Sequence, residues 1–576
     1  MPIRIDFADP HGGAALRCAF DPPQHTLVAH TVAQVRPLLD AVAAWAQQGR
    51  WCVGYLRYEA ASAFDAALQT HTADGPLAWF GVFDQARPWP DAATTDDDPG
   101  ALSWHDPLSQ PQFATNMAAI HQAIAAGELY QVNYTTMLQA GFSGSTAALF
   151  ARLQRAQPGG YAACIDSGFE QVLSVSPELF FDWKDGTILT RPMKGTAARG
   201  HSAEEDTARA AALTQSPKER AENVMIVDLL RNDLSRIAEP HSVKVPALFA
   251  VQTLPTVHQM VSDVRARTRP GTTLADVFAA LFPCGSITGA PKVRAMQLIK
   301  SLEPQPRGVY CGAIGVVRPG GHATFSVAIR TVTRQGQLLR CGIGSGITAD
   351  ASADAEWQEW QHKRRFLERA SQRFTLLETL RLQGGEFHLL DWHLARLQAA
   401  ARHFGYPFDL RQVDAALRAL VPPTPDERVW RVRLQLDASG TPSAEKFEQN
   451  STPARVKIAL AATPFEAFES EFTRFKTSRR AHYEAFAPTD PALFDTLLYN
   501  PRGELTECTR GNIAVLLDGQ WCTPALHCGL LAGVGRAHHL AEGRLREAVI
   551  TLADLPRVQA WAFINSLRGW VDAELV

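Results

Sequence analysis

The chain has 576 residues, of which 46% are hydrophobic and 20% charged, and a formal net charge of −3. This length predicts more than one domain, each with its own core, and the near-neutral charge excludes an electrostatic case for nucleic acid or an anionic membrane. The first residues, MPIRIDFADPHGG, lack the pattern of a secretory signal, and no apolar run is long enough to span a membrane. Nine cysteines are scattered without a Cys-x-x-Cys pair, which fits a reducing cytoplasm.

Short strand-like runs and helical patterns alternate in the first part of the chain. Residues 32–48 carry an apolar-rich helical pattern, and residues 51–65 indicate a strand entering a helix. Residues 86–100 are rich in Pro, Asp and Thr, which is typical of a loop or mobile linker. A second helix is predicted over 112–128, followed by an alternating strand in GELYQVNYTTML.

The first residues of the segment SPKERAENVMIVDLLRNDLSRI mark it as a helix. Ser216 is placed to cap it, Pro217 suits the first turn, and Glu219 can complete a capping box. Glu222 lies one turn further on, ahead of an apolar series at helical spacing. The polar residues that follow would on their own be a solvated face with salt links.

A lysine in the turn TRPMKGTAARG gains interest from the motifs around it. Taken alone, Lys194 would be a solvated surface lysine, and Glu178 in SVSPELF a surface carboxylate. The motifs VHQMVS, CGSITGAPKVRAM, YCGAIG, SVAIRT and GIGSGITADASADAEWQEWQHK follow downstream. In this order, they make residues 113–370 resemble the chorismate-utilising enzymes, which include anthranilate synthase, isochorismate synthase and aminodeoxychorismate synthase component I.

The lysine in a P-x-K-G-T turn is similar to the aminodeoxychorismate synthases, whereas anthranilate synthases typically carry alanine there. The resemblance implies that Lys194 is a nucleophile and that Glu178 is the general acid for the leaving ring hydroxyl. His258 in VHQMVS matches the family's conspicuous histidine and is predicted to be catalytic, although a lone histidine would be assigned to the core. Gln131 stands where relatives that add water to chorismate carry a lysine base; glutamine cannot deprotonate water, and on its own it would be an ordinary strand residue.

The resemblance also implies a magnesium site formed by two helices. The family places a metal ligand at Glu222, and Glu356 and Glu359 in SADAEWQEWQHK share one helix face. Mg²⁺ prefers oxygen ligands and keeps several waters, so one glutamate from each helix is a sensible cradle. We expect Glu222 and Glu359 to bind the metal, with Glu356 and the capping residue Glu219 as second choices.

Chorismate carries two carboxylates, so anion donors are implied as well. Arg330 in SVAIRT and Tyr310 in VYCGAIG match family positions that hold the enolpyruvyl carboxylate, and an arginine fork suits that group. Two glycine-containing loops are expected to contribute further donors, from Thr288, Gly289, Gly344, Ser345 and Gly346.

After about residue 372 the chain resembles the fold-type IV pyridoxal-phosphate enzymes, which include branched-chain aminotransferases, D-amino-acid transaminases and aminodeoxychorismate lyase. The resemblance implies that Lys476 in RFKTSRRAHY carries the cofactor and that Glu507 in GELTECTRGNI pairs with its pyridine nitrogen. Arg396 in WHLARL matches the phosphate-binding arginine. Taken singly, the lysine and the arginine would be surface residues.

The phosphate is further expected at GLLAGVGRAHHL, a glycine-rich turn that opens a helix. Its donors are the backbone amides of Val534 and Gly535. Relatives often have threonine where this chain has Gly535, which removes one hydroxyl donor. Ser566 in NSLRG is a candidate for another.

We therefore predict an α+β chain of two abutting domains. Residues 1–372 form a chorismate-binding domain of stacked antiparallel sheets with surrounding helices, and residues 373–576 form a fold-type IV α+β domain. The two resemblances together imply 4-aminobenzoate synthesis for folate: chorismate and ammonia give 4-amino-4-deoxychorismate, which then loses pyruvate. Mg²⁺ and pyridoxal 5′-phosphate are the implied cofactors, and the cytoplasm the implied location.

The sequence shows no glycine-rich nucleophile elbow around a cysteine, so ammonia is expected from a separate glutamine amidotransferase subunit or from solution. A homodimer through the second domain stays open. Three alternatives also stay open: an anthranilate synthase fused to a transaminase-like domain, against which Lys194 argues; a true aminotransferase in the second half; and decay of one half into a binding or regulatory module.

Overall fold

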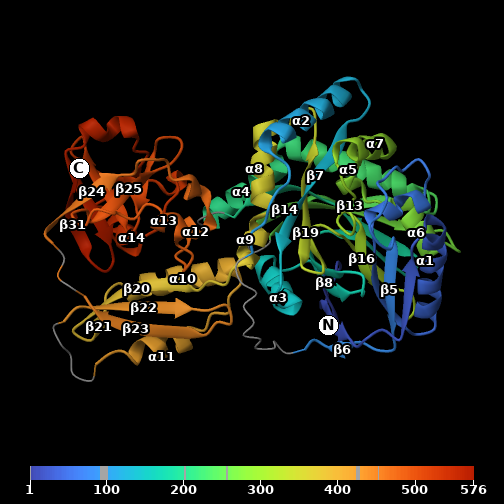
Figure 1. Cartoon of the computed structure of the whole chain (residues 1–576), viewed down its shortest axis with the longest axis horizontal. Helices are drawn as coiled ribbons and strands as arrows, with labels where there is room; N and C mark the ends of the chain where they lie inside the picture. The colour runs from blue at the N-terminus through green and yellow to red at the C-terminus, as the bar shows by residue number, and fades with distance from the viewer. Residues whose placement is uncertain are drawn as a thin grey trace. The chain divides into compact units, whose positions relative to one another are not determined.

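The computed structural model describes residues 2–90, 102–199, 203–253, 257–422, 428–449, 451 and 453–576. The chain divides into two compact units, Met1–Gln372 and Arg373–Val576 (Figure 1). Most of the predicted linker at residues 86–100 lies outside the described residues, and its first part forms a two-residue strand. No helix within the described ranges combines the length and apolar character needed to cross a bilayer.

Unit 1 contains two large sheets in which all strand pairs are antiparallel. The first sheet runs in spatial order β15 (Gly289–Ala290), β7 (Gln131–Gly141), β19 (Leu338–Ile347), β18 (Thr331–Gln335), β9 (Gln171–Ser176), β8 (Tyr161–Asp166), β1 (Ile3–Phe7), β2 (Leu16–Phe20) and β6 (Arg87–Pro88). The second runs β12 (Met193–Ala198), β14 (Val257–Arg267), β11 (Thr187–Arg191), β10 (Leu179–Lys184), β17 (Ala323–Val327), β16 (Ala313–Val317), β4 (Trp51–Leu56), β5 (Ala78–Phe83) and β3 (His25–Ala29), and β13 (Lys244–Thr253) also pairs with β14.

The two sheets of unit 1 stack face to face. One apolar cluster joins Ile5 of β1 and Val172 of β9 to Val53 of β4 and Leu189 of β11. Helices cover the outer faces: α1 (Val32–Gln47), α2 (Gln110–Ala125), α3 (Thr146–Ala156), α4 (Ala203–Gln215), α5 (Pro217–Ser235), α6 (Leu274–Leu281), α7 (Lys292–Leu302), α8 (Ala353–Lys363) and α9 (Arg365–Ser371). This arrangement confirms the predicted α+β class with stacked antiparallel sheets.

Helix α1 shows how the sequence pattern gives these layers. Thr31 and Gln34 form a capping box at its start. Its buried residues recur at helical spacing and pack on the second sheet with α6, as Figure 1 shows on the right; they are Val35, Leu38, Leu39, Val42 and Ala46. The predicted helix over 32–48 is therefore confirmed.

Helix α5 begins as predicted, but only one of the two hydrogen bonds of the predicted capping box is formed. The Ser216 side chain accepts a hydrogen bond from the backbone N–H of Glu219, and Pro217 occupies the first turn. The reciprocal bond from the Glu219 carboxylate to the Ser216 backbone is not formed. That carboxylate instead lies beside Gly195 of β12, which frees it from the structural role the sequence had indicated.

Strand β7 is buried on both faces rather than alternating between core and solvent. Val132, Tyr134 and Leu138 pack toward the helices of the outer layer. Gln131 and Asn133 point to the opposite face and are buried as well. Polar side chains on a doubly buried strand indicate that one face borders a site for a polar ligand.

Unit 2 combines a small antiparallel sheet with a larger mixed sheet. The small sheet runs β21 (Glu386–Phe387), β20 (Leu376–Gln383), β22 (Trp430–Leu436) and β23 (Pro442–Glu448) and shares a core with α10 (Leu390–Phe404) and α11 (Leu410–Arg418). The larger sheet runs β26 (Leu505–Cys508), β25 (Asp495–Tyr499), β24 (Arg455–Leu460), β31 (Gly569–Leu575), β30 (Ala560–Asn565), β27 (Asn512–Leu517), β28 (Gln520–Pro524) and β29 (Arg546–Ala548).

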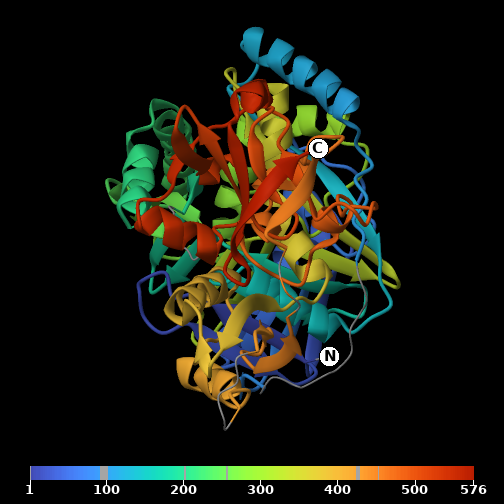
Figure 2. The same ribbon diagram turned by 90° about the vertical axis from the view of Figure 1, so that its left-hand side faces the viewer.

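Three pairs in the larger sheet are parallel: β24 with β25, β24 with β31, and β28 with β29. The remaining helices of this unit are short: α12 (Glu471–Arg474), α13 (Ala481–Glu484) and α14 (Val534–Ala541). The two sheets have separate apolar cores, and Figure 2 shows them as distinct layers.

Candidate active sites

Lys194 lies at an irregular point of β12, and the glycine after it sets its direction. The register of β12 against β14 shifts between Met193 and Thr196. Gly195 adopts a φ of +88°, which strains any residue with a side chain. A Cβ at Gly195 would also come within 2.8 Å of a carboxylate oxygen of Glu219. Glycine is therefore needed here for β12 to approach α5.

The amine of Lys194 lies over β19, next to Gln131. A Cβ built on Gly346 would be 2.9 Å from Lys194 Nζ and 2.2 Å from Gln131 Nε2, so the bare glycine leaves room for both groups. Gln131 is fully buried, and neither polar atom of its amide has a hydrogen-bond partner among the described residues. Because an unpaired buried amide costs free energy, the Gln131 donors and acceptor are available to a bound molecule.

Glu178 is a buried acid in the same site. Its side chain accepts a hydrogen bond from Ser286 Oγ at 2.7 Å, and the residue is 3% exposed. Burial raises the pKa of Glu178 to about 7, against the opposing effects of Ser286 and Lys194. A carboxyl group that keeps its proton near neutral pH has the property that a general acid needs.

Four glutamates from α5 and α8 lie near one another; they are Glu219, Glu222, Glu356 and Glu359. Burial raises the pKa of Glu219, Glu222 and Glu356, and neighbouring carboxylates of the same set raise it further. Within the part of the chain that the structure describes, no three or more metal-binding side chains converge on one point. One glutamate from each helix, with water completing the shell, fits the chemistry of Mg²⁺, and the metal site stays a prediction.

The two glutamates of α8 are held differently. Ser345 donates its hydroxyl to Glu356 at 2.5 Å, so that hydroxyl is engaged with α8. Glu359 is paired with Lys363 at 2.6 Å, and Lys363 also donates to the Gly344 carbonyl at 2.9 Å. A cation bound at Glu359 would therefore compete with Lys363 for the carboxylate.

Arg330 is a half-buried cation that no ion pair joins to a carboxylate within the described residues. It adopts a left-handed φ of +48°, donates to the Gln157 side chain and stacks 5.6 Å from the centroid of the Phe366 ring. Burial and the nearby Arg369 lower the pKa of Arg330 to about 10. An anion beside Arg330 would relieve both effects, as expected for a residue that holds a carboxylate.

The other predicted donors differ in what they can still offer a ligand. The ring of Tyr310 lies flat against Gly342, where a Cβ would approach to 2.1 Å. The Thr288 hydroxyl donates to the carbonyls of Cys284 and Gly285 in its own turn. Gly289 lies close to the backbone of Gln131. His258 has both ring nitrogens engaged: Nε2 lies 2.9 Å from Asp206 and Nδ1 3.1 Å from Thr253 Oγ1, so its predicted catalytic role would require a rearrangement.

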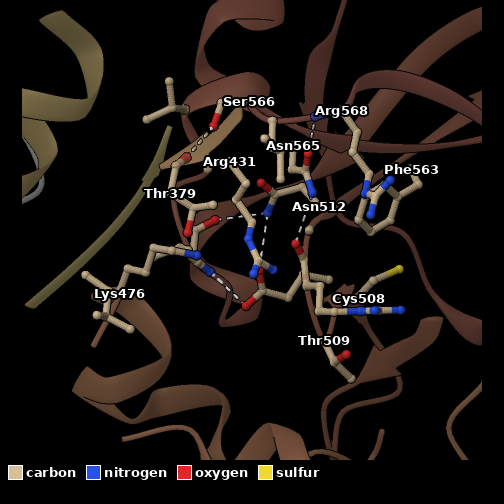
Figure 3. A pocket seen from close by; sticks show the side chains of 18 of the residues that line it. Thr379, Arg431, Lys476, Cys508, Thr509, Asn512, Phe563, Asn565, Ser566 and Arg568 are labelled. Carbon is tan, nitrogen blue, oxygen red and sulfur yellow. Dashed lines mark hydrogen bonds between the residues drawn. The ribbon is translucent and has the colours of Figure 1, made fainter. Parts of the chain in front are cut away.

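Unit 2 contains a cavity of about 410 Å³ (Figure 3). It brings together residues of the small sheet, of the larger sheet and of the loops between them. Every predicted cofactor-binding side chain lines it, together with Val534 at the start of α14; the side chains are Arg396, Lys476, Glu507 and Ser566.

Lys476 and Glu507 carry opposite pKa shifts in this cavity. Burial, together with Arg396 and Arg480, lowers the pKa of Lys476 to about 8. Burial raises the pKa of Glu507 to about 7. Glu507 accepts hydrogen bonds from Tyr483 at 2.6 Å and from the backbone N–H of Leu531 at 3.0 Å. A protonated ring nitrogen opposite Glu507 would favour its charged form.

A buried carboxylate fixes Arg396. The Nε and one Nη group of Arg396 donate to Glu378 at 2.8 and 2.6 Å, and the other Nη group donates to the Ala532 carbonyl at 3.1 Å. His393 approaches the same carboxylate at 2.6 Å. Burial raises the pKa of Glu378, but Arg396 and His393 outweigh it and bring it down to about 2. Glu378 thus stays charged and locks the guanidinium in place.

The start of α14 packs closely against the turn after β30. A Cβ at Gly535 would come within 2.9 Å of the Asn565 backbone and 3.1 Å of the Ser566 nitrogen. This conformation has no room for a threonine at this position. Helix N-terminal amides, a fixed arginine, a lysine with a lowered pKa and a buried carboxylate fit the phosphate, aldehyde and ring nitrogen of pyridoxal phosphate.

The sequence analysis did not identify the residues that hold Glu507 and Arg396 in place. Tyr483 and His393 stand inside the motifs RFKTSRRAHY and WHLARL, so their spacing from Lys476 and Arg396 could have indicated them. No local pattern pointed to Glu378, which reaches the site from β20.

Two family models match the chain. Residues 87–369 match the model described as chorismate binding enzyme, and residues 375–576 match the model described as amino-transferase class IV. Aminodeoxychorismate synthase component 1 of Klebsiella aerogenes is 44% identical over 257 residues, which cover 45% of this chain and 57% of the relative. The chain thus spans little more than half the length of that relative.

Two further likenesses cover more of the related protein. Anthranilate synthase component 1 of Methanothermobacter marburgensis is 32% identical over 338 residues, which cover 55% of this chain and 73% of that protein. The crystal structure of anthranilate synthase component I from Streptococcus pneumoniae aligns with a TM-score of 0.52 at 26% identity, covering 64% of this chain and 90% of the other.

Proposed function

The chain belongs to the chorismate binding enzymes and carries a class IV amino-transferase region behind them, and on this premise we propose that it makes 4-aminobenzoate. Unit 1 converts chorismate and ammonia to 4-amino-4-deoxychorismate, and unit 2 removes pyruvate from that product. The product of one unit is the substrate of the other, so the pairing of the two regions supports the proposal.

The observation that carries the first half is the position of Lys194. Its amine and the unpartnered amide of Gln131 lie over Gly346, and Lys194 interacts electrostatically with Glu178. Lys194 in its neutral form attacks C2 of chorismate while Glu178 gives its proton to the hydroxyl that leaves C4 as water. Ammonia then bonds to C4, and the bond between C2 and the lysine breaks.

Binding groups around this centre hold the two carboxylates of chorismate. Arg330 and Tyr310 bind the enolpyruvyl carboxylate. Glu222 and Glu359 would hold Mg²⁺, and the cation would bind the ring carboxylate. Ammonia comes from a separate glutamine amidotransferase subunit or from solution, and a homodimer through unit 2 is an open part of the proposal.

In unit 2, pyridoxal phosphate supplies an electron sink when it is bound. Arg396 and the amides of Val534 and Gly535 would hold its phosphate, and Glu507 would keep its ring nitrogen protonated. Lys476 would carry the cofactor and accept the proton from C4 of the substrate. A pKa of about 8 leaves part of Lys476 neutral near physiological pH, as a proton acceptor requires.

Product analysis tests the whole proposal. The purified chain with chorismate, Mg²⁺, pyridoxal phosphate and an ammonium salt at alkaline pH should release 4-aminobenzoate and pyruvate in equal amounts, whereas glutamine alone should give no product. Anthranilate as the product would support an anthranilate synthase instead. Amino transfer that depends on a 2-oxoacid, without pyruvate release, would support a true aminotransferase.

A further inference from the structure

The outer half of the cavity in unit 2 carries charges that the cofactor does not use. Besides Arg396 and Arg480, four arginines line it; they are Arg431, Arg433, Arg510 and Arg568. Among the described lining residues, Glu507 is the one carboxylate. A cofactor with one phosphate leaves a large excess of positive charge on this side.

Three of these arginines come from different segments and interact with one another. Arg431 lies on β22, Arg510 between β26 and β27, and Arg568 between β30 and β31. Burial lowers the pKa of Arg568, and Arg510 and Arg431 lower it further. All three arginines line the same cavity, close enough together for their charges to repel one another.

Aromatic rings orient these groups. The guanidinium of Arg431 lies 5.0 Å from the centroid of the Phe447 ring. Arg510 and Arg568 lie 5.1 and 5.5 Å from that of Phe494. Asp495 approaches Arg510 at 3.4 Å, whereas no ion pair joins Arg431 to a carboxylate in the described ranges. Arg510 also donates to the Phe494 carbonyl. The Phe447 ring lies beside one face of Arg431, and a planar guanidinium can still bind an anion through its polar edge.

We infer that Arg431, Arg510 and Arg568 form the subsite for the two carboxylates of a dianionic substrate. This inference rests on the proposed function, in which the substrate amine points to Lys476 and its carboxylates extend outward. Planar arginine forks bind carboxylates in pairs of hydrogen bonds. An apolar amino acid offers this outer half a single carboxylate, so the subsite favours the lyase substrate over that of an ordinary aminotransferase.

The test uses the full chain with bound pyridoxal phosphate. Its visible absorbance reports binding in unit 2 alone, so a ligand that also binds unit 1 causes no confusion. The probe is 3-[(1-carboxyvinyl)oxy]benzoate, which has both carboxylates but no amine, and 3-methoxybenzoate is its monoanionic counterpart. The wild type should bind the dianion at least about tenfold more tightly, since each fork bound to a carboxylate contributes.

Arg431→Gln and Arg568→Gln should each lower that preference at least about fivefold and raise the KM for 4-amino-4-deoxychorismate more than they lower kcat. Arg431→Lys should restore part of the preference. The control Arg455→Gln, an exposed arginine of β24 outside the cavity, should change neither. An unchanged preference in the glutamine variants, or equal wild-type affinity for both probes, overturns the subsite. Dianion preference in a wild type that releases no 4-aminobenzoate would instead overturn the proposed function and keep the subsite.

Discussion

The two candidate active sites each contain a lysine, and opposite charges surround these lysines. Lys194 lies among Glu178, Glu219 and Glu222, whereas Lys476 is half-buried beside Arg396 and Arg480. Nearby guanidinium groups disfavour an ammonium. Together with burial they lower the pKa of Lys476 to about 8, so part of this lysine is neutral near physiological pH. In unit 1, Glu178 is a buried acid that can supply a proton, and the other glutamates can hold a cation.

Replacing the lysine of unit 2 has the largest expected effect. Lys476→Ala should abolish the visible absorbance of the bound cofactor and cut 4-aminobenzoate release more than about 1,000-fold, because both cofactor attachment and proton transfer are lost. Chorismate consumption should continue, so 4-amino-4-deoxychorismate accumulates and is measured by chromatography. Release at the wild-type rate would show that Lys476 is not the cofactor lysine.

Replacing the lysine of unit 1 should stop the other half of the pathway. Lys194→Ala should lose at least about 100-fold in 4-amino-4-deoxychorismate formation and leak a little anthranilate, because C2 is no longer blocked. Mass spectrometry should detect a protein adduct in the wild type given chorismate without ammonia, and none in the variant. The control Lys184→Ala, at an exposed position on β10, should behave as wild type. A Lys194 variant with full output would rule out the covalent mechanism.

The pH dependence of the synthase rate tests whether Glu178 is the general acid of unit 1. Burial raises the pKa of Glu178 to about 7, and only the protonated form can donate. At a fixed concentration of free ammonia, the synthase rate should therefore fall as the pH rises through about 7. Glu178→Gln should cost roughly 100-fold and remove this dependence. Asp228→Asn, at an exposed position of α5, should retain it. A pH profile that is the same in wild type and Glu178→Gln would assign the titration to another group.

The smallest expected effect concerns how unit 2 holds its arginine. Glu378→Gln removes the charge that fixes Arg396 and should weaken pyridoxal phosphate binding about tenfold, in the range seen for residues that orient binding groups. Titration of the cofactor, followed by absorbance, measures this change. Glu386→Gln, at an exposed position of β21, is the matched control. Unchanged affinity would show that Arg396 needs no such support.

The sequence predicted the layers well because they follow from local patterns. Apolar spacing and a capping box defined α1, and Ser216 with Pro217 defined the start of α5. The hydrogen bond predicted from Glu219 to the start of α5 was wrong. The Glu219 carboxylate lies beside Gly195 of β12 instead, a contact between segments that local sequence does not reveal. Strand β7 was expected to alternate, but a second layer buries its other face.

The candidate residues of the sites were named from motifs, whereas their partners were not. Ser286 reaches Glu178 and Glu378 reaches Arg396 from distant segments, and no sequence pattern encodes such contacts. For His258, in contrast, the motif predicted more than the structure supports. Its motif suggested catalysis, but the structure engages both of its ring nitrogens with Asp206 and Thr253.

Three glycines of β19 lie beneath side chains of the unit 1 site. Gly342, Gly344 and Gly346 alternate along β19, and a Cβ at each would collide with a neighbour: the Tyr310 ring, Thr135, or Gln131. A side chain at any of these three positions would therefore displace a residue of the site. A saturation library of β19 should therefore show intolerance of any side chain at Gly342, Gly344 and Gly346.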